Sequence, residues 1–334
     1  MVYSVIATNL RLKIKCRWFL VRILIYMNKK YLLGFVLGVV VIGLLTLAIK
    51  NNNGAPVVSS SKPQAVASFY PLYFFASQIA GDKADVSNIT PAGAEPHDYE
   101  PTPQQIARIA DSNLLVLNGG GLEAWADNVT ENSDPKKTTI VIAGEGLMTQ
   151  EVVEEGEKIA DPHVWLSPVL AVQMVNKIET GLIKADPDNA SHYQSNAQIL
   201  KSKLENLNTE FEQGLVTCKD KNIITSHAAF GYLASTYDLN QVPITGVSPD
   251  AEPSPQELAQ VAKFARDNHV KYIFFESLVS PKLSQTIATE VGAQTLVLNP
   301  LEGLTGEEIA SGKDYFSEMR NNLANLKTAL QCTP

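Results

Sequence analysis

Short apolar runs alternate with amphipathic stretches along this chain, and this alternation limits its fold more than any other feature. In the first half of the chain, runs of strand length and of helix length follow one another in the order Ala65–Ser68, Tyr73–Gly81, Asp85–Thr90, Pro103–Asp111, Leu114–Asn118, Leu122–Thr130 and Thr139–Ala143. Regular alternation of strands and helices predicts a mainly parallel sheet that is covered on both faces by helices. We therefore expect an α/β fold.

The same alternation returns in the second half of the chain. Its expected strands and helices are Asn222–Ser226, Gly231–Tyr237, Gln241–Ile244, Pro255–Asn268, Tyr272–Glu276, Pro281–Val291, Gln294–Leu298 and Tyr315–Gln331. A single core stops growing near ~250–300 residues, and this chain has 334. We predict two lobes, each with a mainly parallel four-stranded sheet flanked by helices.

A long helix is predicted between the two halves, from Asp188 to about Leu215. Its apolar residues recur at spacings of three and four, which is typical of one buried stripe: Ile199, Leu200, Leu204, Leu207 and Phe211. We expect one rigid helix to join the lobes and to limit their relative motion to small tilts.

The segment Tyr31–Ile49 contains no charged residue, and its length matches the ~20 residues that a helix needs to cross a membrane. Most of the basic residues near it precede it, so the positive-inside rule puts the N-terminus in the cytoplasm and the rest of the chain outside. No A-x-A pattern and no cysteine for lipid attachment directly follow the segment. We expect an uncleaved anchor, with cleavage near Ala48 as the alternative.

These features divide the chain into six expected parts. They are an N-terminal extension upstream of a second start at Met27 (1–26), a signal anchor (27–50), a polar linker (51–63), an N-terminal α/β lobe (64–186), a linking helix (187–215) and a C-terminal α/β lobe (216–334).

The charged residues argue against nucleic acid as a partner. The chain has 27 Lys and Arg against 35 Asp and Glu, and no basic block after Lys62 would suit a phosphate backbone. Exposed charges are screened beyond roughly 8 Å at physiological salt, so a mildly acidic surface attracts cations only weakly. Any metal ion must be held at a specific site.

Two of the three cysteines lie where disulfides persist. Cys16 precedes the expected anchor and faces a reducing compartment, whereas Cys218 and Cys332 lie outside. We predict a Cys218–Cys332 disulfide that ties the C-terminal helix to the start of the second lobe. The alternative is two unrelated buried thiols.

Three of the five histidines share a position relative to the expected elements. His97 follows a strand, His163 precedes a helix, and His227 stands at the carboxyl end of a strand, which is where ligands bind in open α/β sheets. Imidazole is also a preferred zinc donor, although a single loop histidine is more often a surface residue. We expect His192 and His269 to face solvent.

A carboxylate would complete a tetrahedral site with three histidines. Glu302 follows the last expected strand in a Pro/Gly loop, and a carboxylate there would neutralise one of the two charges of Zn²⁺. Glu276 at the end of the strand YIFFE competes for this role, and Glu302 could also be an exposed loop acid.

Seven segments occur in a recognisable order. They are ASFYPLYFFASQIAG, GAEPHDYEPTPQQ, LVLNGGGLEAW, DPHVWLSP, TSHAAFGYLA, GVSPDAEPSP and FFESLVSP. From about Val66 to the C-terminus the chain therefore closely resembles the zinc/manganese solute-binding proteins of ABC importers, in particular their zinc-binding ZnuA/AdcA-like members of cluster A-I.

The resemblance implies a fold, a site and partners. The fold would be two four-stranded α/β lobes bridged by one long helix. His97, His163 and His227 would bind the metal, and the NPLEG motif resembles the subgroup whose fourth ligand is Glu, which favours Glu302 over Glu276 or water. An ABC permease and its ATPase would be the partners of an otherwise monomeric, membrane-tethered protein on the extracytoplasmic face of the cell membrane.

The sequence departs from the family in the segment Thr149–Ala160. Many zinc-specific members have a histidine-rich loop here, whereas this segment is acidic and contains no histidine. We expect a solvated, mobile loop. Manganese-selective relatives usually replace the third histidine with a carboxylate, so His227 favours Zn²⁺ over Mn²⁺ as the transported ion. Asp98, Glu100 and Ser226 are candidate orienters of the imidazoles.

A zinc hydrolase and a metal-binding adhesin are the alternatives to a transporter subunit. A zinc hydrolase would keep an open coordination position for water, and the sequence has none of the H-E-x-x-H, G-x-S-x-G or phosphate-loop motifs, so we do not expect an enzyme. A metal-binding adhesin would retain the same metal site, and only a test of uptake or of attachment separates it from a transporter subunit.

Overall fold

The computed structural model describes residues 62–154 and 157–333, which fall in one compact unit, Lys62–Pro334. The expected extension 1–26, the signal anchor 27–50 with its apolar segment Tyr31–Ile49, and all but the last two residues of the linker 51–63 lie outside the described residues. Within residues 62–154 and 157–333, no helix is both long enough and apolar enough to span a bilayer.

The first lobe is built on a parallel four-stranded sheet. In chain order its strands are β1 (Gln64–Ala67), β2 (Asp85–Asn88), β3 (Leu114–Leu117) and β4 (Thr139–Ile142), and their order in the sheet is β2-β1-β3-β4. The accompanying helices are α3 (Tyr70–Ala80), α4 (Pro103–Asp111), α5 (Ala126–Glu131) and α6 (Pro168–Ala185). Strand β3 (LLVL) is buried at all four residues, as expected for a central strand covered on both faces.

The second lobe repeats this plan. Its strands are β7 (Asn222–Thr225), β8 (Asn240–Pro243), β9 (Tyr272–Phe275) and β10 (Gln294–Val297), in the sheet order β10-β9-β7-β8. The helices are α8 (Gly231–Thr236), α9 (Pro255–Asp267), α10 (Lys282–Val291), α11 (Gly306–Ala310) and α12 (Tyr315–Ala329). In both sheets the first strand of the lobe lies between its second and third strands, so the prediction of two matching lobes is confirmed.

Capping boxes fix the starts of several helices. In each box, the side chain of the N-cap residue accepts a hydrogen bond from the backbone N–H of the third helical residue, and the side chain of that third residue accepts one from the backbone N–H of the N-cap. The pairs are Thr102–Gln105, Ser254–Glu257, Thr305–Glu308 and Asp314–Ser317. Proline at the first helical position, as at Pro103 and Pro255, fixes φ without losing a hydrogen bond.

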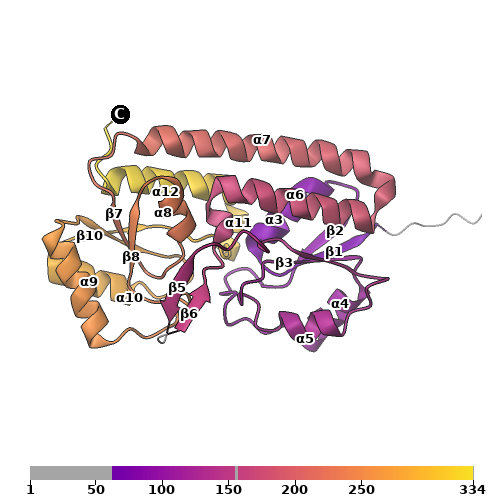
Figure 1. Ribbon diagram of the computed structural model, residues 1–334, viewed down its shortest axis with the longest axis horizontal. Coiled ribbons are helices and arrows are strands. Elements are labelled where there is room, and N and C mark those ends of the chain that lie inside the picture. The colour runs from indigo at the N-terminus through magenta and orange to yellow at the C-terminus, as the bar shows by residue number, and fades with distance from the viewer. Residues whose placement is uncertain (1–61, 155–156, 334) are drawn as a thin grey trace, which may run out of the picture. The chain divides into compact units, whose positions relative to one another are not determined.

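Helix α7 (Ala190–Leu215) joins the lobes, as predicted, and packs against α3, α6 and α12 (Figure 1). A short 3₁₀ helix, Pro187–Asn189, precedes it. Its buried stripe is Tyr193, Ala197, Leu200, Leu204, Leu207, Phe211 and Leu215. Including Ile199 in this stripe was wrong, because that side chain is 55% exposed, one position off the buried face.

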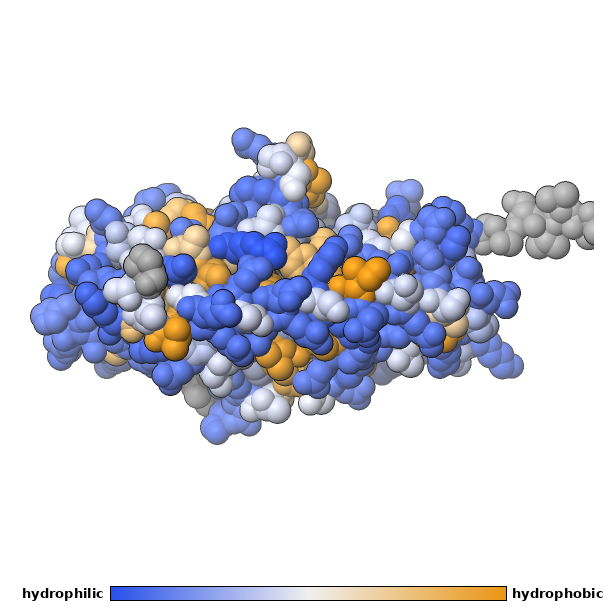
Figure 2. Space-filling model, turned by 90° about the horizontal axis from the view of Figure 1, so that it is seen from above, coloured by the Kyte–Doolittle hydropathy of each residue, from blue (hydrophilic) through white to orange (hydrophobic). Residues whose placement is uncertain are grey.

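Seen from above, the surface of the protein is mainly hydrophilic with small separate apolar groups (Figure 2).

The sequence predicts a loop over Thr149–Ala160, but the described residues of this segment include an antiparallel strand pair, β5 (Glu151–Glu154) and β6 (Glu157–Ala160), referred to below as the hairpin. The half-buried Val152 and Ile159 are paired across it. At its base the backbone N–H of Gln150 donates to the Tyr232 hydroxyl of the second lobe, at 3.2 Å. This contact between distant residues orders an acidic segment in which local composition indicates a loop.

Cys218 and Cys332 are joined in a disulfide that spans 114 residues of sequence. Around it, the backbone N–H groups of Lys219 and Asp220 both donate to the carbonyl of Leu330. The end of α12 is therefore fastened beside the chain that follows α7.

Candidate metal centre

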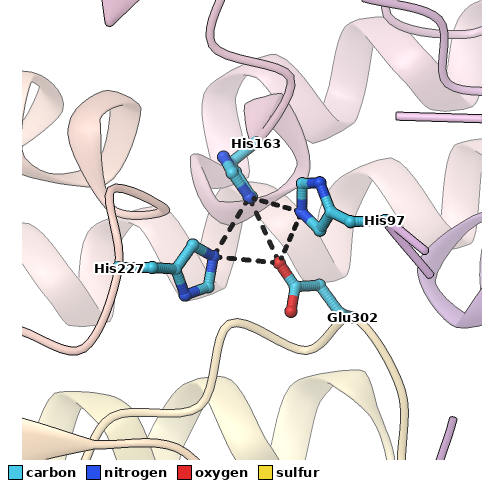
Figure 3. A group of neighbouring side chains, drawn as sticks. All are labelled: His97, His163, His227 and Glu302. Atoms are coloured by element: carbon cyan, nitrogen blue, oxygen red, sulfur yellow. Dashed lines mark hydrogen bonds and ion pairs between the residues drawn. The ribbon is translucent and has the colours of Figure 1, made fainter. Parts of the chain in front are cut away.

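Three histidines and one glutamate gather at the junction of the two lobes (Figure 3). His97 follows β2, His227 follows β7, and Glu302 lies between β10 and α11. The sequence predicts that all three histidines lie at strand ends of the four-stranded sheets, but His163 does not follow such a strand. It lies three residues after the end of the hairpin strand β6 and caps a 3₁₀ turn, Val164–Leu166.

Five of the six separations between the donor atoms of these four residues match the spacing of a tetrahedral metal site, and all four atoms lie within 4.8 Å of one another. The Nε2 atoms of His97, His163 and His227 lie 3.3, 3.1 and 3.2 Å from Oε1 of Glu302. Nε2 of His163 is also 3.3 Å from Nε2 of each of the other two histidines. Zinc–nitrogen bonds of ~2.0–2.1 Å would put tetrahedral donors about 3.3–3.4 Å apart. The side chains can therefore hold an ion of this size with little rearrangement.

The four side chains are almost completely removed from solvent. His163 and His227 are 0% exposed, Glu302 is 1% exposed and His97 is 8% exposed. Burial would raise the pKa of the Glu302 carboxyl, but His227 and hydrogen bonds from the imidazoles bring this pKa well below its usual range. The glutamate is therefore ionised. A buried carboxylate needs such compensation, because an unpaired buried charge costs several kcal/mol.

The histidines respond differently to these surroundings. Burial lowers the pKa of His97 against the opposing effect of Glu302. Burial also acts to lower the pKa values of His163 and His227, but the neighbouring carboxylates outweigh it and raise both, that of His227 strongly. At Glu95, burial and then the charge of Glu302 raise the pKa to about 9, so this carboxyl is protonated at neutral pH.

Two buried carboxylates orient the imidazoles. Oδ1 of Asp161 lies 2.8 Å from Nδ1 of His163, and Oε1 of Glu276 lies 2.6 Å from Nδ1 of His227. An Nδ1–H that donates to a carboxylate leaves the Nε2 lone pair free for a metal and makes it more basic. The carboxylates thus fix both the tautomer and the direction of each ring.

Glu276, the alternative to Glu302 in the sequence, therefore contacts the far side of His227 and lies outside the group of four. The candidate orienters Asp98, Glu100 and Ser226 were wrong choices. Among the described residues the partners of Nδ1 are Asp161 and Glu276, and Ser226 instead contacts Ser284. The DPH motif could have identified Asp161 as the partner of His163, because an acid two residues before a histidine can bond to it locally. The Asp161 carboxylate also accepts from the backbone N–H of His163, at 2.9 Å.

Backbone conformation and side-chain amides position Glu302. Leu301 has a φ of 55°, a left-handed conformation that is costly for a residue other than glycine. Asn299 stabilises this turn, because its Oδ1 accepts from the Leu301 N–H at 2.8 Å. Asn299 is itself held by Asn322, which bonds to both its N–H and its carbonyl.

The segment that carries His163 is fastened to the second lobe. The Trp165 indole N–H donates to the carbonyl of Pro300 at 2.8 Å, and the Tyr315 hydroxyl donates to the carbonyl of Trp165 at 2.6 Å. The Tyr232 hydroxyl donates to the carbonyl of Asp161 at 3.0 Å. His163 is thus positioned by groups of both lobes.

The two remaining histidines lie away from this centre. His269 is exposed, as expected, and has a left-handed φ of 54° at the end of α9. His192 is only partly exposed, since its Nε2 lies 3.0 Å from the side chain of Asn196 and 3.7 Å from that of Asp82.

Comparisons with known proteins agree with this architecture. The high-affinity zinc uptake system protein ZnuA of Bacillus subtilis is 40% identical over 300 residues, which cover 86% of this chain and 94% of that protein. The crystal structure of the Zn(II)-bound ZnuA-like domain of Streptococcus pneumoniae AdcA is 40% identical, with a TM-score of 0.71 over 81% of this chain and 99% of that one. The zinc-binding protein AdcA of Streptococcus pyogenes is longer, and this chain spans 56% of its length at 39% identity.

The laminin-binding protein Lmb of Streptococcus agalactiae is also similar, at 35% identity and a TM-score of 0.73 over 81% of this chain and all of that one. Its structure is described as that of a bifunctional protein with adhesin and metal transporting activity.

Two matching α/β lobes that are bridged by one long helix define a two-lobed solute-binding protein. The family model described as "Zinc-uptake complex component A periplasmic" matches residues 65–329. The chain belongs to this ZnuA family, which confirms the resemblance found in the sequence.

Replacing Glu276 with glutamine tests the orientation of His227. Because an amide accepts the Nδ1–H less strongly than a carboxylate, we expect E276Q to weaken Zn²⁺ binding by about 10–100-fold in a competition titration. The matched control is E290Q, at a glutamate whose side chain is 67% exposed, and it should leave affinity unchanged. Equal affinities for the two variants would contradict the role of Glu276.

The pKa shifts predict a pH dependence of metal affinity. A proton on Nε2 competes with the metal, and raised pKa values of His163 and His227 mean that protonation begins above the usual histidine value of about 6.5. Zn²⁺ affinity should therefore fall as pH decreases from 8, by up to about tenfold per pH unit for each displaced proton. Titrations at constant ionic strength check this, and constant affinity from pH 8 to 5 would contradict it.

Proposed function

We propose that this chain captures Zn²⁺ outside the cytoplasm and delivers it to the membrane permease of an ABC importer. The observation that carries the proposal is the group of three imidazole nitrogens and one carboxylate oxygen, because five of their six separations are 3.1–3.3 Å and match the donor spacing around zinc. Relatives named as zinc uptake and zinc-binding proteins support the same ion.

The proposed ligands are His97, His163, His227 and Glu302, which come from both lobes. We assign the lobes to residues 64–186 and 216–334, with the helix 187–215 between them. An ion bound by both lobes would cross-link them and lower their relative motion, and a permease could recognise that state. Delivery then requires the ligands to be separated or protonated.

The donor set favours zinc over manganese. Three imidazoles and one carboxylate suit Zn²⁺, whereas Mn²⁺ prefers oxygen-rich sites and lies lower in the Irving–Williams order. Four protein ligands would also complete the tetrahedral coordination sphere of zinc and leave no position for a reactive water molecule. This supports a zinc-transport protein over a hydrolase.

Family membership supports an extracytoplasmic location and an ABC permease with its ATPase as partners. A monomer tethered by the segment 27–50 is part of the proposal. Adhesion is a second candidate activity, since the relative Lmb is described as both adhesin and metal transporter. Zinc-limited growth of a deletion strain would report transport, and attachment of cells to laminin would report adhesion.

Titration of the full chain with Zn²⁺ and Mn²⁺ against a competing chelator tests the proposed function. We expect one tight zinc site and much weaker manganese binding. Removing a residue that only hydrogen-bonds to a metal ligand typically weakens binding by about 10–100-fold. Glu302→Ala removes a proposed ligand itself, so we expect it to weaken zinc binding by more than this. Tighter binding of Mn²⁺ than of Zn²⁺ would change the assignment of the transported ion to Mn²⁺. The absence of any tight metal site would refute the proposal.

A further inference from the structure

A cavity of about 430 Å³ lies between the two lobes, and its wall includes Glu302, one of the four candidate ligands. One wall comes from α3 and from the chain after β2, and includes Tyr73 and Ala92. The opposite wall comes from the chain after β10 and from α11, and includes Glu302 and Ile309. Four other cavities of larger volume contain none of the four candidate ligands in their walls.

An ion needs such a path because the centre itself is closed. Three of the four ligand side chains are at most 1% exposed, and densely packed side chains leave no space for an ion to pass. One water molecule takes about 30 Å³ in the liquid, so this cavity can hold an ion with part of its hydration shell. Ala92 is exposed and Ile309 is 50% exposed, so both lie at the mouth of the cavity.

The charges around the cavity favour a cation. Glu302 and Asp314 contribute carboxylates to its wall, and Lys313 is the cationic side chain there. Nζ of Lys313 lies 3.3 Å from carboxylate oxygens of both Glu308 and Glu318, so its charge is compensated. Acidic groups in a low-dielectric cleft concentrate the field and raise the local concentration of cations.

Two residues that line the cavity, Glu302 and Asn88, carry side-chain oxygen atoms with the chemistry to receive a hydrated ion. Glu302 directs Oε1 at the three imidazoles, and its other oxygen points away from them (Figure 3). Asn88 also lines the cavity, and its Oδ1 is buried without a hydrogen-bond partner. Buried acceptors of this kind are normally satisfied by water, and the waters around a metal ion are strong donors.

We infer that this cavity is the path by which Zn²⁺ reaches the centre, and that Glu302 is the first ligand the ion meets. The ion would contact the outer oxygen of Glu302 while still partly hydrated and then move to the three imidazoles. This inference rests on the proposed function. It differs from a path along the exposed side of His97, which does not line the cavity.

Narrowing the mouth of the cavity tests the path. Ala92→Phe adds bulk from the first lobe, and Ile309→Phe adds it from α11, away from the chain segments that carry the ligands. The full chain in mild detergent is mixed with Zn²⁺ in stopped flow, and Trp165, whose ring centroid lies 5.1 Å from that of His163, provides the fluorescence signal. Dissociation is followed after mixing with excess chelator. Ala259→Phe, in the groove between α9 and α10, is the matched control.

A narrowed path must slow binding and release equally, because it changes the barrier and not the bound state. We expect the association and dissociation rate constants to fall by about tenfold in the double variant A92F/I309F, with Kd unchanged within about twofold. The control A259F should match the unmodified chain. Unchanged rates in both single variants and in the double variant would overturn the inference and place the path beside His97.

Two further outcomes separate this inference from the proposed function. A weaker Kd with an unchanged association rate in I309F would show damage to the site and also overturn the path. Absence of tight zinc binding by the unmodified chain would refute the proposed function itself, and the path with it.

Discussion

The structure depends on keeping one ionised carboxylate, Glu302, in a buried space shared with three imidazoles. Such a charge is stable only when other groups compensate it, and here the compensating groups come from segments far apart in the sequence. Strands of the two four-stranded sheets lead to His97, His227 and Glu302, and the segment after the hairpin strand β6 brings His163 to them. The same contacts that stabilise the carboxylate create the donor geometry of a metal site.

Directional hydrogen bonds give this centre its precision. Asp161 and Glu276 fix two rings from behind, and the Asn299–Asn322 pair holds the turn before Glu302. The bond from Trp165 to Pro300 links the segment of His163 to the loop of Glu302 directly. Ligands from different lobes are therefore linked, so a movement of one lobe would displace both His163 and Glu302.

Much of the fold could be predicted from the sequence, because the alternation of strands and helices is local information. Helix α4 and strand β9 match within one residue, and the matching lobes follow from a repeated pattern. The sequence also points to the four side chains at the centre, from their positions and from family resemblance. Their role as metal ligands remains a prediction.

The errors arose where contacts distant in sequence decide the outcome. The hairpin at Thr149–Ala160 is fixed by Tyr232, about 80 residues away, so an acidic local composition was misleading. Glu276 faces His227 across 49 residues of sequence, and no spacing rule could assign it to Nδ1. Ile199 shows the limit of periodicity, because one position along a helix turns a side chain from the core to solvent.

X-ray absorption at the zinc edge, on the full chain loaded with one equivalent of Zn²⁺, tests whether these four side chains bind the ion. We predict four nitrogen or oxygen donors at ~2.0–2.1 Å, with the multiple-scattering signal of three imidazoles. A sulfur shell near ~2.3 Å, or a spectrum with fewer than three imidazoles, would contradict the assignment of His97, His163, His227 and Glu302.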